Sequence, residues 1–316
     1  MRFLLLFLLP CLSFASPLLD PSSTYTVKKE LKGAGVAPKA IENAYSETNI
    51  DFQSFDLNDT SGKPLLSSKT EQLVKMKTLP KDPKDTQAIK DGLDHRVEIT
   101  FEKLLTVSSV KVAGLPKPFE TRSDLGAFLM NKPIVVKGDG KTGKRVEGLE
   151  AIRAKMGEVR DPIAQQTLSG LLKEEILLKT GTAGAQDASC LGSLGGKNPG
   201  AKWTFFREEQ GARLDYECEF EGWAEVKGKK VAVIKVQSKK ARQQRTQPNG
   251  VPGMTETESS GTVYFEPENQ ESMMKMETTI LAEPLESEIK SLEAKGKQVP
   301  RNRTRMWHTS RLYPLL

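Results

Sequence analysis

The strongest constraint on the fold is a regular alternation of apolar and polar residues over positions 213–226. Its apolar or small members are Leu214, Tyr216, Cys218, Phe220, Gly222, Ala224 and Val226. A period of two places one set of side chains on a core and the other in water, as in a half-buried β-strand. Lys227-Gly228-Lys229 then supplies a turn, and Val231 to Val236 returns as an apolar partner. The stretch therefore predicts a long antiparallel hairpin.

The same period recurs along much of the chain between clusters of turn residues. It predicts strands at Tyr25–Leu31, Ser46–Leu57, Leu66–Leu79, His95–Glu102, Ile134–Val136, Thr262–Phe265, Met274–Ile280 and Arg303–Tyr313. Two polar or glycine-rich stretches, 181–200 and 239–260, are expected to be irregular loops. Pro284 is expected to open a brief helix.

The period changes in the middle of the chain. Leu149, Ile152 and Met156 follow helical spacing, and Asp161-Pro162 offers an N-cap with proline at the first helical position. A helical stripe then continues to Gly181, so a pair of helices is expected at about 149–180. The predicted fold is α+β and mainly antiparallel β, with a strongly curved sheet or half-barrel packed on this mid-chain helical pair.

The first fifteen residues have the order of a secretory signal peptide. Met1-Arg2 precedes an apolar run from Phe3 to Leu12, and Ser13-Phe14-Ala15 provides small residues before a cut. The run is shorter than the roughly 20 residues that span a bilayer. We expect an exported protein, periplasmic or extracellular, with a signal peptide at 1–15 and a single β-rich domain at 16–316. Cys11 raises the alternative of a lipoprotein signal, although Leu9-Pro10 stand where such signals need small residues.

Removal of the signal peptide leaves two cysteines, Cys190 and Cys218. An even pair in an oxidising compartment favours a disulfide, and the alternative is that Cys218 is a buried thiol. The net charge of +6 arises from Lys and Arg residues interspersed with Asp and Glu. Nucleic acid is therefore not an expected partner, while the basic tail from Ile289 to Leu316 suggests peripheral contact with an anionic envelope surface.

No motif specifies a reaction. The segment Gly138–Arg145 has the spacing of a phosphate-binding loop, but Arg145 stands where a Ser or Thr hydroxyl is needed, so a hairpin turn is expected. His95 and His308 fall in no metal-ligand or nucleophile spacing and are expected to be structural strand residues. The chain is thus predicted not to be an enzyme and to need no cofactor or metal.

The apolar positions on the long strands are the candidates for a ligand-facing surface. These positions are in excess on the long strands and must be buried against either the helical pair or a bound lipid-like molecule, although core packing is the commoner explanation. Methionine adapts well to varied apolar ligands. The candidate ligand-facing residues are Tyr216, Phe220, Ile234, Val236, Met274 and Met276.

Four segments carry a resemblance to a known family. They are Val135 to Leu149, Gly200-Ala201-Lys202-Trp203 entering a strand, the hairpin from Phe220 to Lys230, and Ser260-Gly261-Thr262-Val263-Tyr264-Phe265. Over roughly the last two thirds of the chain, this pattern resembles a family of exported bacterial domains of unknown function. Such domains are similar in architecture to the periplasmic lipoprotein-carrier fold, a strongly curved antiparallel sheet over helices. The resemblance implies a concave apolar face and no catalytic residue.

Two functions follow as expectations. The first is a non-enzymatic binding or carrier module of the envelope, or a secreted one, that holds a hydrophobic ligand or a lipidated partner. The alternative is a structural or protein-interaction component of the bacterial cell envelope with a solid core. An internal cavity would separate them.

Overall fold

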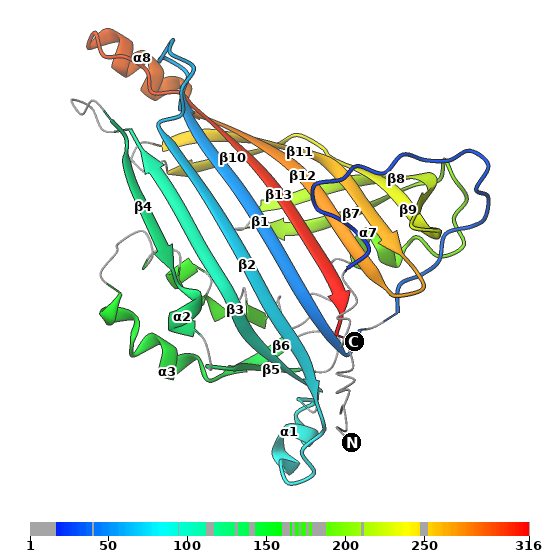
Figure 1. Ribbon diagram of the computed structural model, residues 1–316. Coiled ribbons are helices and arrows are strands. Elements are labelled where there is room, and N and C mark those ends of the chain that lie inside the picture. Colours follow the sequence, from blue (N-terminus) through cyan, green and yellow to red (C-terminus); the bar gives the residue numbers. More distant parts are fainter. Residues whose placement is uncertain are drawn as a thin grey trace, which may run out of the picture.

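One antiparallel sheet organises the protein (Figure 1). The computed structural model describes residues 17–315, with gaps at 40, 94, 112–116, 130–131, 139–142, 160–164, 166–167, 171, 175–176, 179–187, 210–211 and 247–251. The strands are β1 (Asn43–Asp56), β2 (Leu66–Leu79), β3 (His95–Val110), β4 (Phe119–Asp124), β5 (Ile134–Gly138), β6 (Gly143–Glu147), β7 (Lys202–Glu209), β8 (Ala212–Val226), β9 (Lys229–Ser238), β10 (Ala241–Thr246), β11 (Pro252–Glu266), β12 (Glu271–Pro284) and β13 (Asn302–Pro314). The helices are α1 (Thr86–Lys90), α2 (Gly126–Leu129), α3 (Leu149–Arg153), η1 (Met156–Glu158), α7 (Ala188–Gly192) and α8 (Glu286–Ala294).

The first and last strands of the sequence meet in the middle of the sheet. The strand order is β6-β5-β3-β2-β1-β13-β12-β11-β9-β8-β7, with β4 paired to β3 and β10 paired to β11. The β1–β13 pairing runs without a register shift from Ala44 opposite Pro314 to Asp56 opposite Asn302. Antiparallel β structure is thus confirmed, and the centre of the sheet depends on contacts between the two ends of the chain.

The hairpin predicted at 213–236 is present as β8 and β9. Lys227 and Gly228 both have positive φ, +49° and +79°, the combination that joins two strands with a type I′ turn. A bulge between Phe220 and Gly222 shifts the register, however. Trp223 therefore joins Phe220 in the core on one face, while Ala224 packs on the opposite face. The prediction that Gly222, Ala224 and Val226 continue the alternation of Leu214 was wrong, because a bulge inserts one unpaired residue and reverses the faces beyond it.

Three clusters of buried apolar residues cover different parts of the sheet. The first lies over β2, β3 and β5 and includes Ile99 and Leu149. The second joins α7 to β8 and β9, around Phe220. The third lies on the other face of β8, β9 and β11 and includes Leu19 and Val231. The part of the hairpin near its turn, Trp223 and Ala224 of β8 and Val231–Ile234 of β9, is therefore buried on both faces, which explains the uninterrupted apolar run of β9.

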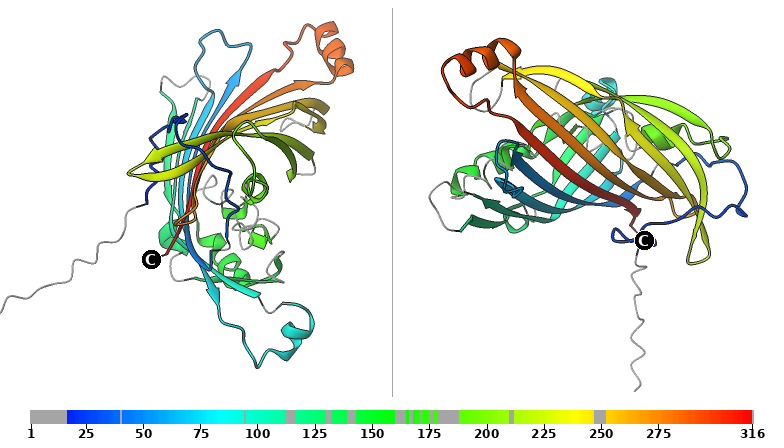
Figure 2. Two further views of the ribbon diagram at one scale, coloured as in Figure 1. Left: turned by 90° about the vertical axis from the view of Figure 1, so that its right-hand side faces the viewer. Right: turned by 90° about the horizontal axis from the view of Figure 1, so that it is seen from above.

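The prediction of a strongly curved sheet or half-barrel was wrong. The sheet is open and twisted (Figure 2). Curvature requires bulges or glycine kinks at repeated positions. The long central strands instead pair without register shifts in β1–β2, β11–β12 and β12–β13.

The prediction of a mid-chain helical pair was also wrong for the residues that the structure describes. Leu149 to Met156 form only the short α3 and η1, and most of 160–187 lies outside the described residues. The apolar stripe still packs on the sheet, since Ile152, Leu168 and Leu172 are buried in the first cluster. A stripe of this kind is satisfied by short helical turns held on a sheet and does not require long helices.

Three further predictions were wrong. The stretch 181–200, expected to be an irregular loop, contains α7 in its described part. The stretch 239–260, expected to be a loop, contains β10 and the first part of β11. The pairing of β10 with β11 is stabilised by cross-strand charge pairs and not by an apolar face. In one such pair, Arg242 Nε lies 2.8 Å from Glu256 Oε2. Tyr25–Leu31, expected to be a strand, runs over the sheet without joining it and makes one backbone bond from Lys28 to the Trp223 carbonyl.

The segment after the predicted cleavage site covers one face of the sheet (Figure 1). The amides of Leu18 and Leu19 donate to the buried carboxylate of Glu271, at 2.7 and 2.8 Å. Burial raises the pKa of Glu271, although both amide hydrogen bonds oppose the rise. Arg311 donates to the Leu19 carbonyl and contacts Glu47. The N-terminal segment is thus fixed to β12 and β13 by specific polar contacts as well as by apolar packing. Residues 1–16, and with them the predicted signal peptide, lie outside the described residues.

Candidate ligand-binding pocket

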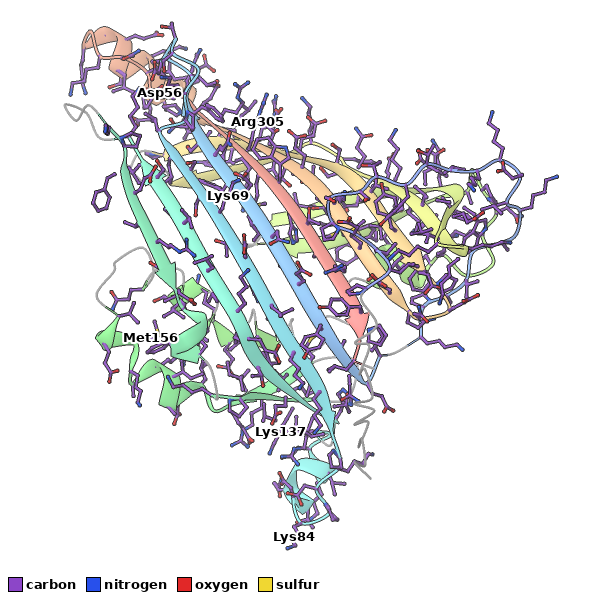
Figure 3. All side chains as sticks on the ribbon, in the orientation of Figure 1. Asp56, Lys69, Lys84, Lys137, Met156 and Arg305 are labelled. Carbon is purple, nitrogen blue, oxygen red and sulfur yellow. A yellow bond between two sulfur atoms is a disulfide. The ribbon has the colours of Figure 1, made fainter. Side chains whose placement is uncertain are left out.

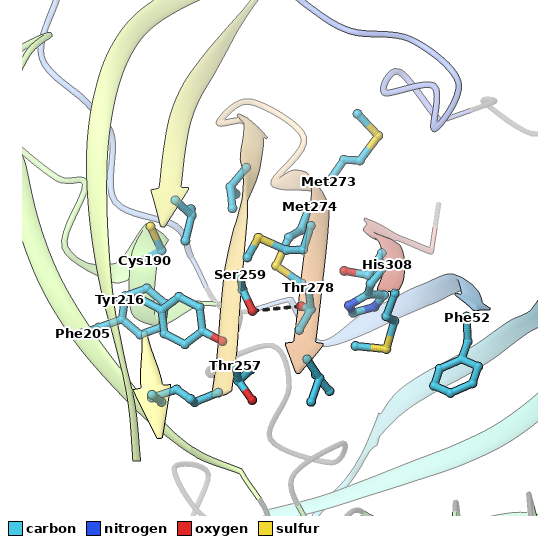
Figure 4. A pocket seen from close by; sticks show the side chains of 18 of the residues that line it. Phe52, Cys190, Phe205, Tyr216, Thr257, Ser259, Met273, Met274, Thr278 and His308 are labelled. Carbon is cyan, nitrogen blue, oxygen red and sulfur yellow. Dashed lines mark hydrogen bonds between the residues drawn. The ribbon is translucent and has the colours of Figure 1, made fainter. Parts of the chain in front are cut away.

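A pocket of about 380 Å³ lies on the face of the sheet that carries the second core cluster (Figure 4). Its walls come from α7, β7, β8 and β9 on one side and from β12, β13 and β1 on the other, with β10 and β11 between them. Apolar residues that line it include Phe205, Leu214, Tyr216, Met274, Met276 and Met306. Polar residues that line it include Thr255, Thr257, Ser259, Thr278, His308 and Ser310.

Strand register explains how residues far apart in sequence meet in this pocket. Gly261 lies opposite Val236 on one side and Met276 on the other, and Met276 lies opposite His308. A Cβ on Gly261 would lie 2.5 Å from the Met276 sulfur and 2.0 Å from the Lys275 carbonyl oxygen. Glycine at this position therefore allows β12 and the Met276 side chain to approach β11 closely.

The aromatic wall is formed by stacking across β7 and β8. The rings of Phe205 and Tyr216 are 5.0 Å apart between centroids and nearly parallel, at 9°. Offset stacking of this kind holds two rings as one rigid surface.

The polar floor of the pocket is hydrogen-bonded within the protein. Ser259 Oγ lies 2.9 Å from Thr278 Oγ1, and the Ser259 amide donates to Ser238 Oγ at 2.7 Å (Figure 4). A hydroxyl can both donate and accept, so each of these groups retains capacity for a further partner. The floor can thus receive a polar ligand group without leaving its own buried groups unsatisfied.

The six candidate ligand-facing residues fall into two groups. Tyr216, Val236, Met274 and Met276 line the pocket. Phe220 and Ile234 are fully buried in the neighbouring core and do not line it. Strand parity placed all six on one face, but parity alone does not distinguish packed positions from open ones. Their contact with a ligand stays a prediction.

The two mature cysteines form a disulfide that helps to build the pocket. Cys190 of α7 is bonded to Cys218 of β8, with their Cα atoms 6.4 Å apart. The bond resolves the alternative between a disulfide and a buried thiol. Trp203 of β7 donates its indole N–H to the Cys190 carbonyl at 3.1 Å. Because Cys190 and Leu191 line the pocket, the disulfide holds part of its wall against the sheet.

Sequence reasoning missed most of the polar lining. Thr255, Thr257 and Ser259 belong to the stretch expected to be a loop, although their spacing of two was a usable signal for a strand. Met306 and Ser310 were recognised only as part of a final strand. No sequence pattern showed that they would lie beside β12, because that pairing joins separate elements.

The residues weighed for catalysis do not come together. His308 lies on β13 and lines the pocket, whereas His95 begins β3 opposite Gly138. The phosphate-loop-like segment joins β5 to β6, two paired antiparallel strands, as expected for a hairpin. Among the described residues, no group of three His, Cys, Asp or Glu side chains is placed to hold a metal ion. None of the helices in the described part of the chain is long and apolar enough to cross a membrane.

The basic tail lies on α8 and β13, and several of its charges are paired within the protein. Lys290 lies 3.0 Å from Glu286, Arg301 lies 3.6 Å from Glu283, and Arg311 contacts Glu47. Contact between this tail and an anionic surface stays a prediction.

In comparisons with known proteins, no family model matches the chain and no curated protein matches it significantly.

Proposed function

We propose that this protein is a non-enzymatic binding or carrier module that holds a hydrophobic ligand, or the acyl chain of a lipidated partner, in the pocket over β11–β13. The observation that carries the proposal is the pocket itself, whose volume of about 380 Å³ falls within the range of small-molecule sites. A hollow of this size beside the core supports the carrier proposal over the alternative of a solid-core structural protein.

The chemistry of the lining supports a flexible apolar ligand. Met274, Met276 and Met306 contribute three unbranched, polarisable side chains to one wall. Such side chains adjust to ligands of differing shape. The opposite wall, built on Phe205 and Tyr216, is rigid. A rigid wall facing an adaptable one suits a chain-like ligand whose position varies along its length.

The proposal includes an extracytoplasmic location. It is supported by the disulfide, which persists in oxidising compartments, and by the signal-peptide pattern of the first fifteen residues.

Native mass spectrometry of the full-length protein, purified gently after expression in a secreting host, tests the proposal. The expected result is a stoichiometric adduct that organic solvent extracts, together with 1:1 binding of the uncharged dye N-phenyl-1-naphthylamine by the extracted protein. Met274→Trp fills the pocket and should weaken dye binding at least tenfold. Glu277→Trp places the same side chain on the opposite face of β12 and should leave binding unchanged. A bare mass together with no dye binding by folded wild-type protein would overturn the proposal.

A further inference from the structure

The central strands separate charged from neutral side chains between their two faces. Alternate positions from Ala44 to Ser54 in β1, Leu66 to Met76 in β2, Gly253 to Phe265 in β11, Ser272 to Ala282 in β12 and Asn302 to Leu312 in β13 contain no Asp, Glu, Lys or Arg. Residues in register share a face, so these positions form one continuous surface, called the neutral face below. The alternate positions on the other face are rich in charges (Lys69 and Arg305 are labelled in Figure 3).

Charged residues on that other face pair across the strands. Lys69 lies opposite Asp51 with 3.6 Å between the charged atoms, and Glu47 contacts Arg311. Such a surface is suited to water and needs no ligand. The neutral face lacks these pairs, although 28% of the whole chain is charged. On these five strands, the absence of charge is therefore confined to the face that carries the pocket.

The described residues that line the pocket are likewise uncharged. Of the residues that the structure describes around it, none is Asp, Glu, Lys or Arg. Its polar groups are hydroxyls, the amide of Gln243 and the imidazole of His308. A charged ligand group placed here would lose its hydration without gaining a permanent counter-ion, which costs several kcal/mol per ion in a partly dry site. An uncharged ester or alcohol would lose less and would regain hydrogen bonds from the hydroxyls.

We propose that the ligand is a single-chain amphiphile whose head group is uncharged and hydrogen-bonding, such as an ester-linked polyol, and that an ionised head group is disfavoured. This inference rests on the proposed function and names the chemical class of its ligand. The acyl chain lies against the methionines and the Phe205–Tyr216 wall. The head group bonds to the hydroxyls of Thr257, Ser259 and Thr278.

Two probes with the same acyl chain test the inference: 1-monomyristoylglycerol and sodium myristate, each displacing N-phenyl-1-naphthylamine at pH 8, where the myristate carboxylate is ionised. We expect wild-type protein to bind the monoglyceride at least tenfold more tightly. Thr257→Lys supplies a cation inside the pocket and should reduce that ratio at least tenfold by strengthening myristate binding. Ser260→Lys is the matched control, because Ser260 is exposed on the opposite face of β11, and it should leave the ratio unchanged.

The lining also contains the imidazole of His308, whose nitrogens can hydrogen-bond a head group. His308→Gln should retain the preference for the monoglyceride at pH 8, because the proposed head-group contacts are the hydroxyls. Loss of the preference in this variant would assign selectivity to the imidazole and overturn the role of the hydroxyls.

The outcomes separate this inference from the proposed function. Equal or tighter binding of myristate by wild-type protein would overturn the neutral-head assignment and leave the carrier function standing. Failure of both probes and of the dye to bind protein that is folded by circular dichroism would overturn the carrier function itself. The comparison of the two probes on wild-type protein does not depend on the folding of any variant.

Discussion

Strands β8 and β9 are buried on both faces near their turn and on one face elsewhere, whereas β1 and β13 are half-exposed along almost their whole length. The first pair carries large apolar side chains such as Phe220 and Ile234, both fully buried. The second pair presents a mixture of Ser, Thr and apolar side chains such as Phe52 and Met306 on the neutral face, and charges on the other. The difference indicates a division of roles within one sheet: the β8–β9 region provides hydrophobic stability, and the central strands remain open beside the pocket.

The largest expected effect comes from truncating one apolar side chain in each of the two regions. Phe220→Ala should lower the free energy of unfolding by about 3–5 kcal/mol, because it removes a fully buried ring that packs edge-on against Trp223. Met306→Ala, in the half-exposed pocket wall, should cost less than about 1 kcal/mol. Urea unfolding followed by circular dichroism measures both. Similar losses in the two variants would contradict the proposed division.

Removal of the disulfide should have the next largest effect. The bond closes a loop of sequence separation 28, and its loss in a Cys190→Ala, Cys218→Ala double variant should cost about 3–4 kcal/mol. Because α7 forms part of the pocket wall, dye affinity should fall as well. The control is dye affinity of the double variant under strongly stabilising conditions, such as added sulfate. Unchanged affinity there would show that the disulfide stabilises the fold without shaping the pocket.

The buried carboxylate that holds the N-terminal segment makes stability depend on pH. Burial raises the pKa of Glu271 above its usual 4.5, so the folded protein binds this proton more tightly than the unfolded chain does. The contribution of this tighter proton binding to folding stability is fully present below pH 4.5. It is lost as the pH rises through the higher pKa of the folded state. The stability of wild-type protein relative to Glu271→Gln should therefore fall over this window, by less than about 1.4 kcal/mol per pH unit. A difference that grows with pH would contradict this assignment.

The smallest effects compare the two faces of β2 at adjacent residues. Lys69→Ala removes an exposed ion pair with Asp51 and should change stability by less than about 0.5 kcal/mol. Thr70→Val removes a hydroxyl 3.3 Å from that of the buried Thr106 and should cost about 1 kcal/mol. Thermal unfolding of both variants at two salt concentrations provides the measurement. Only the Lys69→Ala difference should depend on salt, and a salt-dependent Thr70→Val effect would count against the neutral character of that face.

Much of the fold could be read from the period of the sequence. Leu66–Leu79 was predicted with the bounds that the structure has, and the final strand at 303–313 differs by one residue at each end. These strands are long, alternate along most of their length and are flanked by turn residues, so local sequence was sufficient. The stretch 239–260 was wrongly predicted to be a loop. Both faces of its strands carry mainly polar residues, so the sequence shows no difference between a core-facing and a solvent-facing side.

The candidate site was predicted only in part, and the reason is geometric. Tyr216, Val236, Met274 and Met276 line the pocket, but Phe220 and Ile234, which share their face, are covered by the neighbouring core. Burial of a side chain depends on what lies above it, and in this region that includes α7, held down by a bond formed across 28 residues.

The sequence by itself determined which residues alternate along most of the strands and where the chain turns. Those properties follow from the identity of neighbouring residues along one strand. Tertiary structure alone decided that β1 lies beside β13, that a bulge at Gly222 moves Ala224 to the opposite face, and that a pocket remains between Tyr216 and Met306. These properties depend on the register between strands distant in sequence, which the pattern of any single strand does not specify.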